Sequence, residues 1–127
     1  MAYKVAGSRY MNTYNKLLNE YSSFDFIREC GIRVLLLECD EEKNRNGRRT
    51  YADCSKLTDK VSAIANCDFV ITFYACDELD DNRLKILTYH EMKHIGCSPD
   101  GKLKIIPHDV EDFKDIIDEY GTDWVQQ

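Results

Sequence analysis

Two of the three histidines in the chain, His90 and His94, enclose the pattern H-E-x-x-H. Residues four apart on a helix lie on the same side, so these two imidazoles are close enough to bind one zinc ion. Glu91 follows the first histidine directly and can sit beside such a metal to transfer protons. The pattern therefore predicts a zinc site on a helix, although so short a match also occurs on helices whose histidines are simply solvated.

The third histidine, His108, follows the predicted helix and completes a set of three imidazoles. Three-histidine zinc sites with an open fourth position are a known catalytic arrangement. We therefore predict one zinc ion (Zn2+) per chain, bound by His90, His94 and His108. The segment 96–107 must then fold back across the end of the helix. Cys97 is an alternative third ligand, because it stands three residues after His94.

The predicted ligands would leave one metal position for water, which loses a proton near neutral pH when it is bound to zinc. Glu91 would accept that proton and pass it to the leaving amine, so it is the predicted catalytic residue. These parts describe hydrolysis of a peptide bond, and they would serve another amide or an ester as well. Arg83, Tyr89 and Tyr120 are candidates for stabilising the oxyanion.

The H-E-x-x-H pattern lies in a segment whose apolar residues recur at helical spacing, which predicts a helix that runs to about Ile95. Asp80 or Asp81 can cap the N-terminus of this helix, and Gly96 can end it. The two histidines flank the predicted core stripe, where a metal site is anchored on the core and open to a cleft. The stripe comprises Leu84, Leu87, Thr88, Met92 and Ile95.

Strand signals lie upstream of this helix, and the strongest covers residues 67–76. Residues 32–39 are a continuous apolar run, expected as a strand that is buried on both faces. Residues 42–49 contain Asn46-Gly47, a hairpin turn signal, so 49–55 is expected as the return strand. Zinc peptidases pair an extended substrate with an edge strand beside the signature helix, and by analogy we expect residues 67–76 to have this role.

Three further helices are expected from the spacing of apolar residues. The first begins at Ser8 and ends near Ser22, the second lies within residues 56–65, and the third lies between Asp109 and Gly121.

The order of these elements predicts an α+β fold. We expect a mixed or antiparallel sheet of three to four strands, an N-terminal helix and two C-terminal helices packed over the sheet. Residues 1–8 carry little pattern and are expected as an arm, and residues 102–106 as a short extended segment. The length favours a single domain of residues 1–127.

Composition excludes several classes of protein. The formal net charge of −6 argues against a general nucleic-acid or anionic-membrane surface. The longest apolar runs are far shorter than a membrane span, and the N-terminus lacks the apolar segment of a secretory signal. The six cysteines include no C-x-x-C pair, so we expect free thiols in a cytoplasmic protein.

Several of these segments resemble the putative phage metallopeptidase family, which comprises small zincin-like proteins of bacteriophages and prophages. The resemblance is carried by residues 89–95, by residues 107–113 and by Tyr120-Gly121, and it spans roughly residues 10–121. It implies a zincin-like domain that binds zinc through His90 and His94, with Glu91 as the catalytic acid/base. The block H-D-V-E-x-F at residues 108–113 makes His108 the implied third ligand. The implied location is the bacterial cytoplasm during phage growth.

Two classes of function stay open at this point. The first is a zinc-dependent peptidase that acts on a peptide or protein substrate. The second is a zinc-stabilised binding protein without catalysis, such as a phage-encoded inhibitor of a host defence system, whose acidic surface would bind a host protein. Glu91 favours the enzyme, because a structural zinc site needs no such glutamate and prefers four closed ligands. The small size and the negative charge favour the binding protein.

Overall fold

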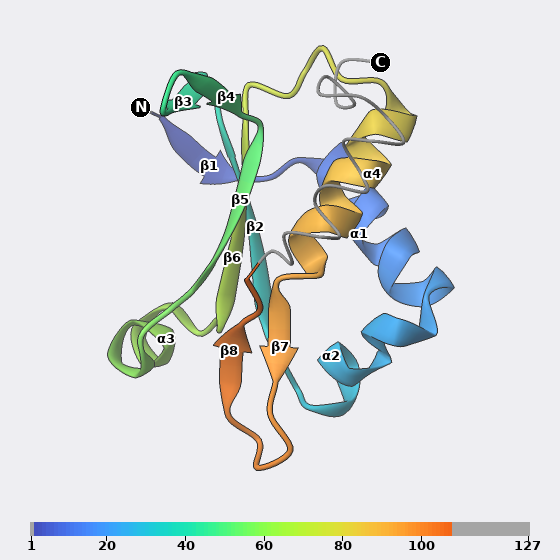
Figure 1. The fold of residues 1–127 in the computed structure, drawn as a ribbon, viewed down its shortest axis with the longest axis vertical. Coiled ribbons are helices and arrows are strands. Elements are labelled where there is room, and N and C mark those ends of the chain that lie inside the picture. Colours follow the sequence, from blue (N-terminus) through green and yellow to red (C-terminus); the bar gives the residue numbers. More distant parts are fainter. Residues whose placement is uncertain (1, 108–127) are drawn as a thin grey trace.

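A mixed four-stranded sheet forms the centre of the computed structural model, which describes residues 2–107 (Figure 1). The strand order is β1-β2-β6-β5, with β2 and β6 parallel and the two outer pairings antiparallel. This agrees with the predicted α+β class and with the predicted three to four strands. The strands are β1 (Tyr3–Val5), β2 (Val34–Cys39), β5 (Ala52–Lys56) and β6 (Phe69–Tyr74).

Helices α1 (Ser8–Glu20) and α4 (Asp81–Met92) contact each other and lie on one side of the sheet (Figure 1). The predicted apolar stripe of α4 is buried throughout, from Leu84 to Ile95. The aromatic residues of α1 also face the sheet, and the ring of Tyr10 lies 4.7 Å from that of Phe73 on β6. Shorter helical segments are η1 (Ser22–Phe24), α2 (Asp25–Glu29) and α3 (Asp59–Ala65).

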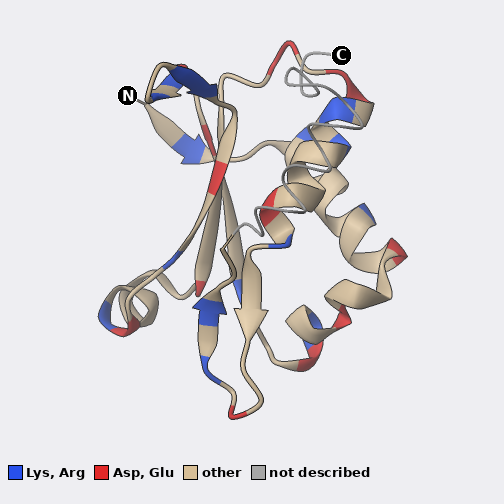
Figure 2. Ribbon diagram, in the orientation of Figure 1, with Lys and Arg blue, Asp and Glu red and all other residues tan. Residues whose placement is uncertain are grey.

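Two hairpins stand outside the main sheet. The first joins β3 (Lys43–Arg45) to β4 (Arg48–Thr50) and carries Lys and Arg side chains (Figure 2). Its turn confirms the hairpin signal, because Asn46 and Gly47 both have positive φ angles, of 54° and 75°. The second joins β7 (Ile95–Cys97) to β8 (Leu103–Ile105), the latter within the predicted extended segment.

The strand pairing differs from the prediction in two places. Residues 3–5 of the expected arm form β1, because the outer edge of β2 offers backbone partners: Ala6 N–H donates to Leu36 O at 2.9 Å. The expected return strand 49–55 is split at Tyr51, so only its first part closes the β3–β4 hairpin. Its second part is β5, which pairs with β6 and not with the strand that precedes it. As a result β6 is an interior strand, and β5 is the edge strand.

Other expectations have mixed outcomes. Helix α1 begins at Ser8 as predicted but ends at Glu20, two residues before the expected stop. All six cysteines are free thiols. No helix among residues 2–107 is long and apolar enough to cross a membrane. The helix expected between Asp109 and Gly121 lies outside the described residues.

Candidate metal centre

Helix α4 carries the first histidine of the candidate site on its last turn. The helix was expected to continue to Ile95, but it ends at Met92, so His94 lies in the turn that follows. That turn is tightened, because His94 N–H donates to Glu91 O, three residues back, at 3.1 Å. The physical reason is competition for the backbone: Ile95 begins β7 and pairs with Ile105 on β8.

The two imidazoles nevertheless stay together. Their ring centroids are 5.3 Å apart, and the ring planes meet at 77°. The Nδ1 atom of His94 lies 2.6 Å from the carbonyl oxygen of Ile106. A histidine that donates from Nδ1 to a backbone carbonyl presents the lone pair of Nε2 to a metal, and this contact fixes the ring orientation. The contact with Ile106 therefore fixes the orientation of the His94 ring.

The β7–β8 hairpin returns the chain to the end of α4. Ile106 N–H donates to His94 O at 2.8 Å, and a turn with Gly101 at φ +86° reverses the chain. Gly96, expected as a helix stop, instead lies within β7. A Cβ atom there would approach the side chain of Ile106 to 2.7 Å, so glycine allows the close approach of the two strands.

Glu91 is the most unusual group of the site. Its side chain faces the core and is only 5% exposed, and it makes no hydrogen bond or ion pair with any residue in 2–107. Burial, with a further contribution from the charge of Asp53, raises the pKa of Glu91 to about 8. A buried carboxyl group without a polar partner costs free energy, so its presence here calls for a functional explanation.

The structure brings the rings of His90 and His94 together. The two described candidates for stabilising the oxyanion, Tyr89 and Arg83, have other partners. Tyr89 packs its ring against Phe24 and Tyr21. Arg83 is bound to Asp80 at the opposite end of α4. Neither is therefore placed to stabilise an oxyanion at the histidines.

None of the described residues joins the two imidazoles as a third metal ligand. Cys97 lies at the far end of β7, and the thiol of Cys30 is a direct neighbour that contributes to raising its pKa, after burial. His108 and Tyr120 lie outside the described residues. Among residues 2–107, no group of three His, Cys, Asp or Glu side chains is arranged to hold a metal ion. The two neighbouring imidazoles are a donor type that zinc accepts.

Sequence reasoning missed the two residues of β5 that lie near Glu91. Burial, with a further contribution from the charge of Glu91, raises the pKa of Cys54 to about 12. The charge of Asp53 contributes to raising the pKa of Glu91. Asp53 is held by Lys43 Nζ at 2.7 Å and by the Tyr74 hydroxyl at 2.9 Å. No local pattern identifies these residues, because their proximity depends on β5 pairing with β6.

Comparisons with known proteins identify the family of the chain. No curated protein and no solved structure matches the chain. The family model described as "Putative phage metallopeptidase" matches residues 4–127, which is nearly the whole chain. The chain therefore belongs to the putative phage metallopeptidase family.

Proposed function

We propose that this protein is a zinc-dependent peptidase in which Glu91 is the general base. The observation that carries the proposal is the buried Glu91 carboxyl group, which has no polar partner in residues 2–107 and stands between the two histidines in sequence. A carboxyl group whose pKa is raised to near neutrality is suited to accept and return a proton. The structural alternative, a closed zinc site that only holds the fold, gives this group no task.

The proposed ligands are His90, His94 and His108. Support for His108 comes from the β7–β8 hairpin. It holds Ile106 against His94 through two contacts, one at the N–H and one at the carbonyl oxygen of Ile106. Two further residues can reach about 7 Å from Ile106, so a ligand at position 108 is within range of the two rings. When bound, zinc would supply a Lewis acid that polarises the scissile carbonyl and acidifies the attacking water.

The proposed substrate platform is β5, which takes the role that the sequence had suggested for residues 67–76. Its outer edge is not hydrogen-bonded to any described strand, and it contacts α4. Tyr51 and Leu57 bond to β6, so the alternation of the antiparallel ladder turns the backbone groups of Ala52, Cys54 and Lys56 outward. Those groups can pair with an extended peptide. The charge of Glu91 contributes to raising the pKa of Cys54, after burial, which supports a position of such a peptide near the proposed base.

The decisive experiment compares the parent protein with Glu91→Gln. The parent should contain one zinc ion per chain by elemental analysis and cleave peptides. The variant should keep the zinc ion and the fold but lose about 10²–10⁴-fold in kcat/KM, because glutamine keeps the shape and removes the base. A variant that binds zinc and cleaves at the parental rate would overturn the assignment of Glu91.

The same variant separates the peptidase from the binding protein. In a phage growth assay, a peptidase should lose its effect with Glu91→Gln. Full activity of the variant would instead support the zinc-stabilised binding protein, for which hydrolysis is irrelevant.

A further inference from the structure

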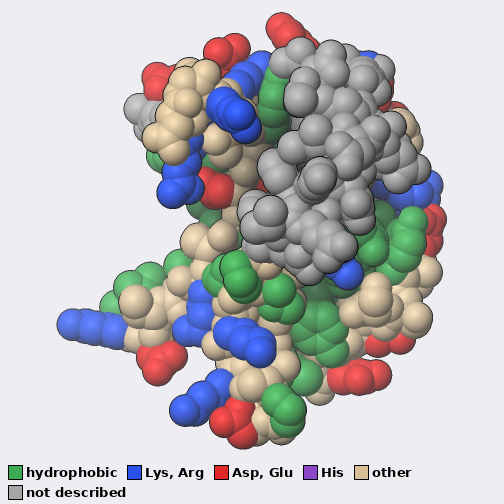
Figure 3. Space-filling model, viewed as in Figure 1, with side chains coloured by type: hydrophobic (Ala, Val, Ile, Leu, Met, Phe, Trp, Pro, Cys, Tyr) green, Lys and Arg blue, Asp and Glu red, His purple; other side chains and the backbone are tan. Residues whose placement is uncertain are grey.

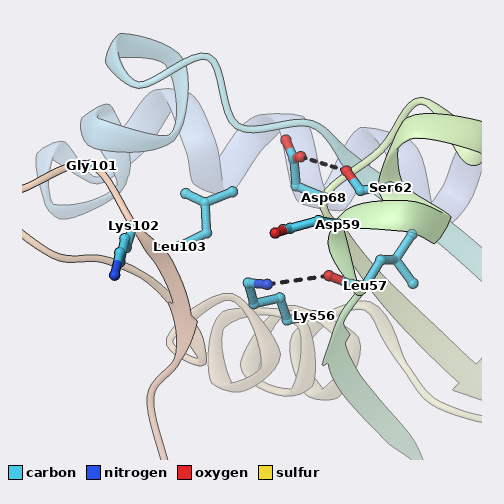
Figure 4. Close-up of a pocket in the computed structure, with 8 residues that line it drawn as sticks. All are labelled: Lys56, Leu57, Asp59, Ser62, Asp68, Gly101, Lys102 and Leu103. Carbon is cyan, nitrogen blue, oxygen red and sulfur yellow. Dashed lines mark hydrogen bonds between the residues drawn. The ribbon is translucent and has the colours of Figure 1, made fainter.

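A pocket of about 350 Å³ lies beyond the end of β5, on the path that a substrate bound to this strand would follow (Figure 4). Its walls come from the end of β5, from the start of α3 with the neighbouring Asp68, and from the β7–β8 turn with Leu103. This volume is within the range of small-molecule sites and accommodates one amino-acid side chain.

The pocket lies on the same face of the sheet as Glu91. Side chains of a strand alternate between its two faces, so Lys56 projects on the same face as Cys54. Cys54 packs against the hydrophobic core that includes Leu84, Leu87 and Met92 of α4, and β5 contacts α4. Two residues along a strand span about 7 Å. A peptide whose scissile bond lies at Glu91 would therefore place a side chain two residues away at Lys56.

Two opposite charges face this space. Figure 4 shows the side chains of Lys56 and Asp59 directed toward one region of the pocket from separate segments. Lys56 donates one hydrogen bond, to Leu57 O at 3.2 Å, which leaves two of its three N–H donors for a ligand. Asp59 makes no hydrogen bond or ion pair with the described residues, so its oxygens are acceptors without a protein donor there.

The remaining polar groups of the pocket are already engaged. Asp68 is bound by Arg33 at 3.1 Å and by the Ser62 hydroxyl at 3.0 Å, and this arginine lowers the pKa of Asp68. The ammonium group of Lys102 is directed away from the space between Lys56 and Asp59 (Figure 4). The surface around α3 and the β7–β8 hairpin shows both signs of charge, with Lys and Arg side chains more prominent than acidic ones (Figure 3).

The pair of Lys56 and Asp59 favours a neutral ligand that both accepts and donates hydrogen bonds over a ligand of either charge. A carboxylate ligand would be attracted by Lys56 and repelled by Asp59, and an ammonium ligand would meet the reverse. A primary carboxamide is neutral, and it offers an acceptor oxygen to Lys56 and N–H donors to Asp59. Each of these contacts is a charge-assisted hydrogen bond, which is stronger than a neutral one.

We propose that this pocket is a side-chain subsite that takes the carboxamide of asparagine or glutamine, two residues from the bond that is cleaved. The position relative to the cleaved bond rests on the proposed peptidase function, but the chemical preference of the pocket does not. Lys56 and Asp59 are the residues that determine specificity.

The test digests a degenerate peptide library with the zinc-loaded protein and identifies the new termini by mass spectrometry. Glutamine or asparagine should be enriched at one fixed position, two residues from the cleaved bond. Matched peptides with glutamine there should show about tenfold higher kcat/KM than those with glutamate, lysine or leucine, a ratio expected from one charge-assisted bond. No preference at any position near the cleaved bond would overturn the subsite.

Two single substitutions should redirect the preference in opposite ways. Lys56→Met leaves Asp59 alone and should favour lysine in the peptide, and Asp59→Asn leaves Lys56 alone and should favour glutamate. Lys60→Met is the matched control, because Lys60 is exposed on α3 and does not line the pocket. It should keep the parental preference. Identical specificity in all three variants would refute the roles of Lys56 and Asp59.

Binding separates failure of the subsite from failure of the proposed function. Fluorescein-labelled heptapeptide pools with glutamine, glutamate, lysine or leucine fixed at the centre are titrated with the parent and the variants, and anisotropy is measured. If no peptide is cleaved but the glutamine pool binds tightest and the variants shift that order, the subsite stands and the peptidase does not. Equal binding of all pools refutes the subsite.

Discussion

The two ends of α4 differ in the hydrogen bonding of their polar groups. At the N-terminal end, Asp80 accepts a hydrogen bond from Arg83 N at 2.8 Å, and the guanidinium of Arg9 donates to the carbonyl oxygens of Cys76 and Leu79. At the C-terminal end, Glu91 is buried without a polar partner in residues 2–107. The N-terminal end is capped at its backbone, although Arg83 Nε is buried there without a hydrogen-bond partner among the described residues. The C-terminal end instead buries a carboxyl group whose pKa is raised toward neutrality.

The largest expected effect comes from substitutions at the C-terminal end of α4, and it is a loss of metal affinity. His94→Ala and His108→Ala should each weaken zinc binding by orders of magnitude, because a ligand is removed from a set of three. Affinity is measured by competition with a chromophoric chelator. Cys97→Ala is the control and should leave the affinity unchanged. The proposed ligand set is wrong if Cys97→Ala weakens binding and His108→Ala does not.

An intermediate effect is expected on the stability of the metal-free protein. Burial raises the pKa of Glu91 from its ordinary value of 4.5 to about 8, so between these pH values the folded state holds a proton that the unfolded state releases. Stability contributed by this group therefore falls as pH rises from about 4.5 to 8 and is level above that range. Glu91→Gln removes the penalty, on the order of a few kcal/mol at pH 8.

The measurement is urea unfolding of both proteins in the presence of a chelator at pH 5.5 and pH 8. The variant should exceed the parent in free energy of unfolding by much more at pH 8 than at pH 5.5. Equal differences at the two pH values would show that Glu91 is not a neutral, buried group in the folded protein.

The smallest expected effect is on the free energy of unfolding, from a substitution at the N-terminal end of α4. Asp80→Ala removes the N-cap hydrogen bond to Arg83 N and should cost about 1 kcal/mol of unfolding free energy. Zinc affinity should stay at the parental value, because the cap lies more than two turns from His90. Asp80→Asn, which retains a capping oxygen, should recover most of the loss. A clear drop in zinc affinity in Asp80→Ala would show that the two ends of α4 are coupled.

Local patterns predicted the elements that local chemistry determines. The stripe of α4, its cap at Asp80, the Asn46-Gly47 turn and the start of α1 at Ser8 all depend on residues within one or two turns of each other. The spacing of the H-E-x-x-H pattern brought the rings of His90 and His94 together for the same reason. These features needed no knowledge of which strand lies beside which.

The errors arose where distant segments compete for the same backbone groups. Helix α4 ends early because Ile95 pairs with Ile105, and the segment 49–55 divides because β6 offers a partner to its second half. The residues of β5 near Glu91 were missed for that reason. The buried state of Glu91 was also hidden, because its position in the helix fixes its direction but not what covers it.

The β7–β8 hairpin has a consequence for chain entropy. His94 and Ile106 are 12 residues apart, and closing a flexible loop of that length would cost roughly 2 kcal/mol or more when the metal binds. In the folded protein the hairpin holds His94 and Ile106 together, so that loop is closed before any metal binds. Zinc affinity should therefore depend on how firmly the hairpin is formed. We therefore expect Gly96, which lets the side chain of Ile106 lie against β7, to affect the affinity for the proposed zinc ion through the hairpin alone.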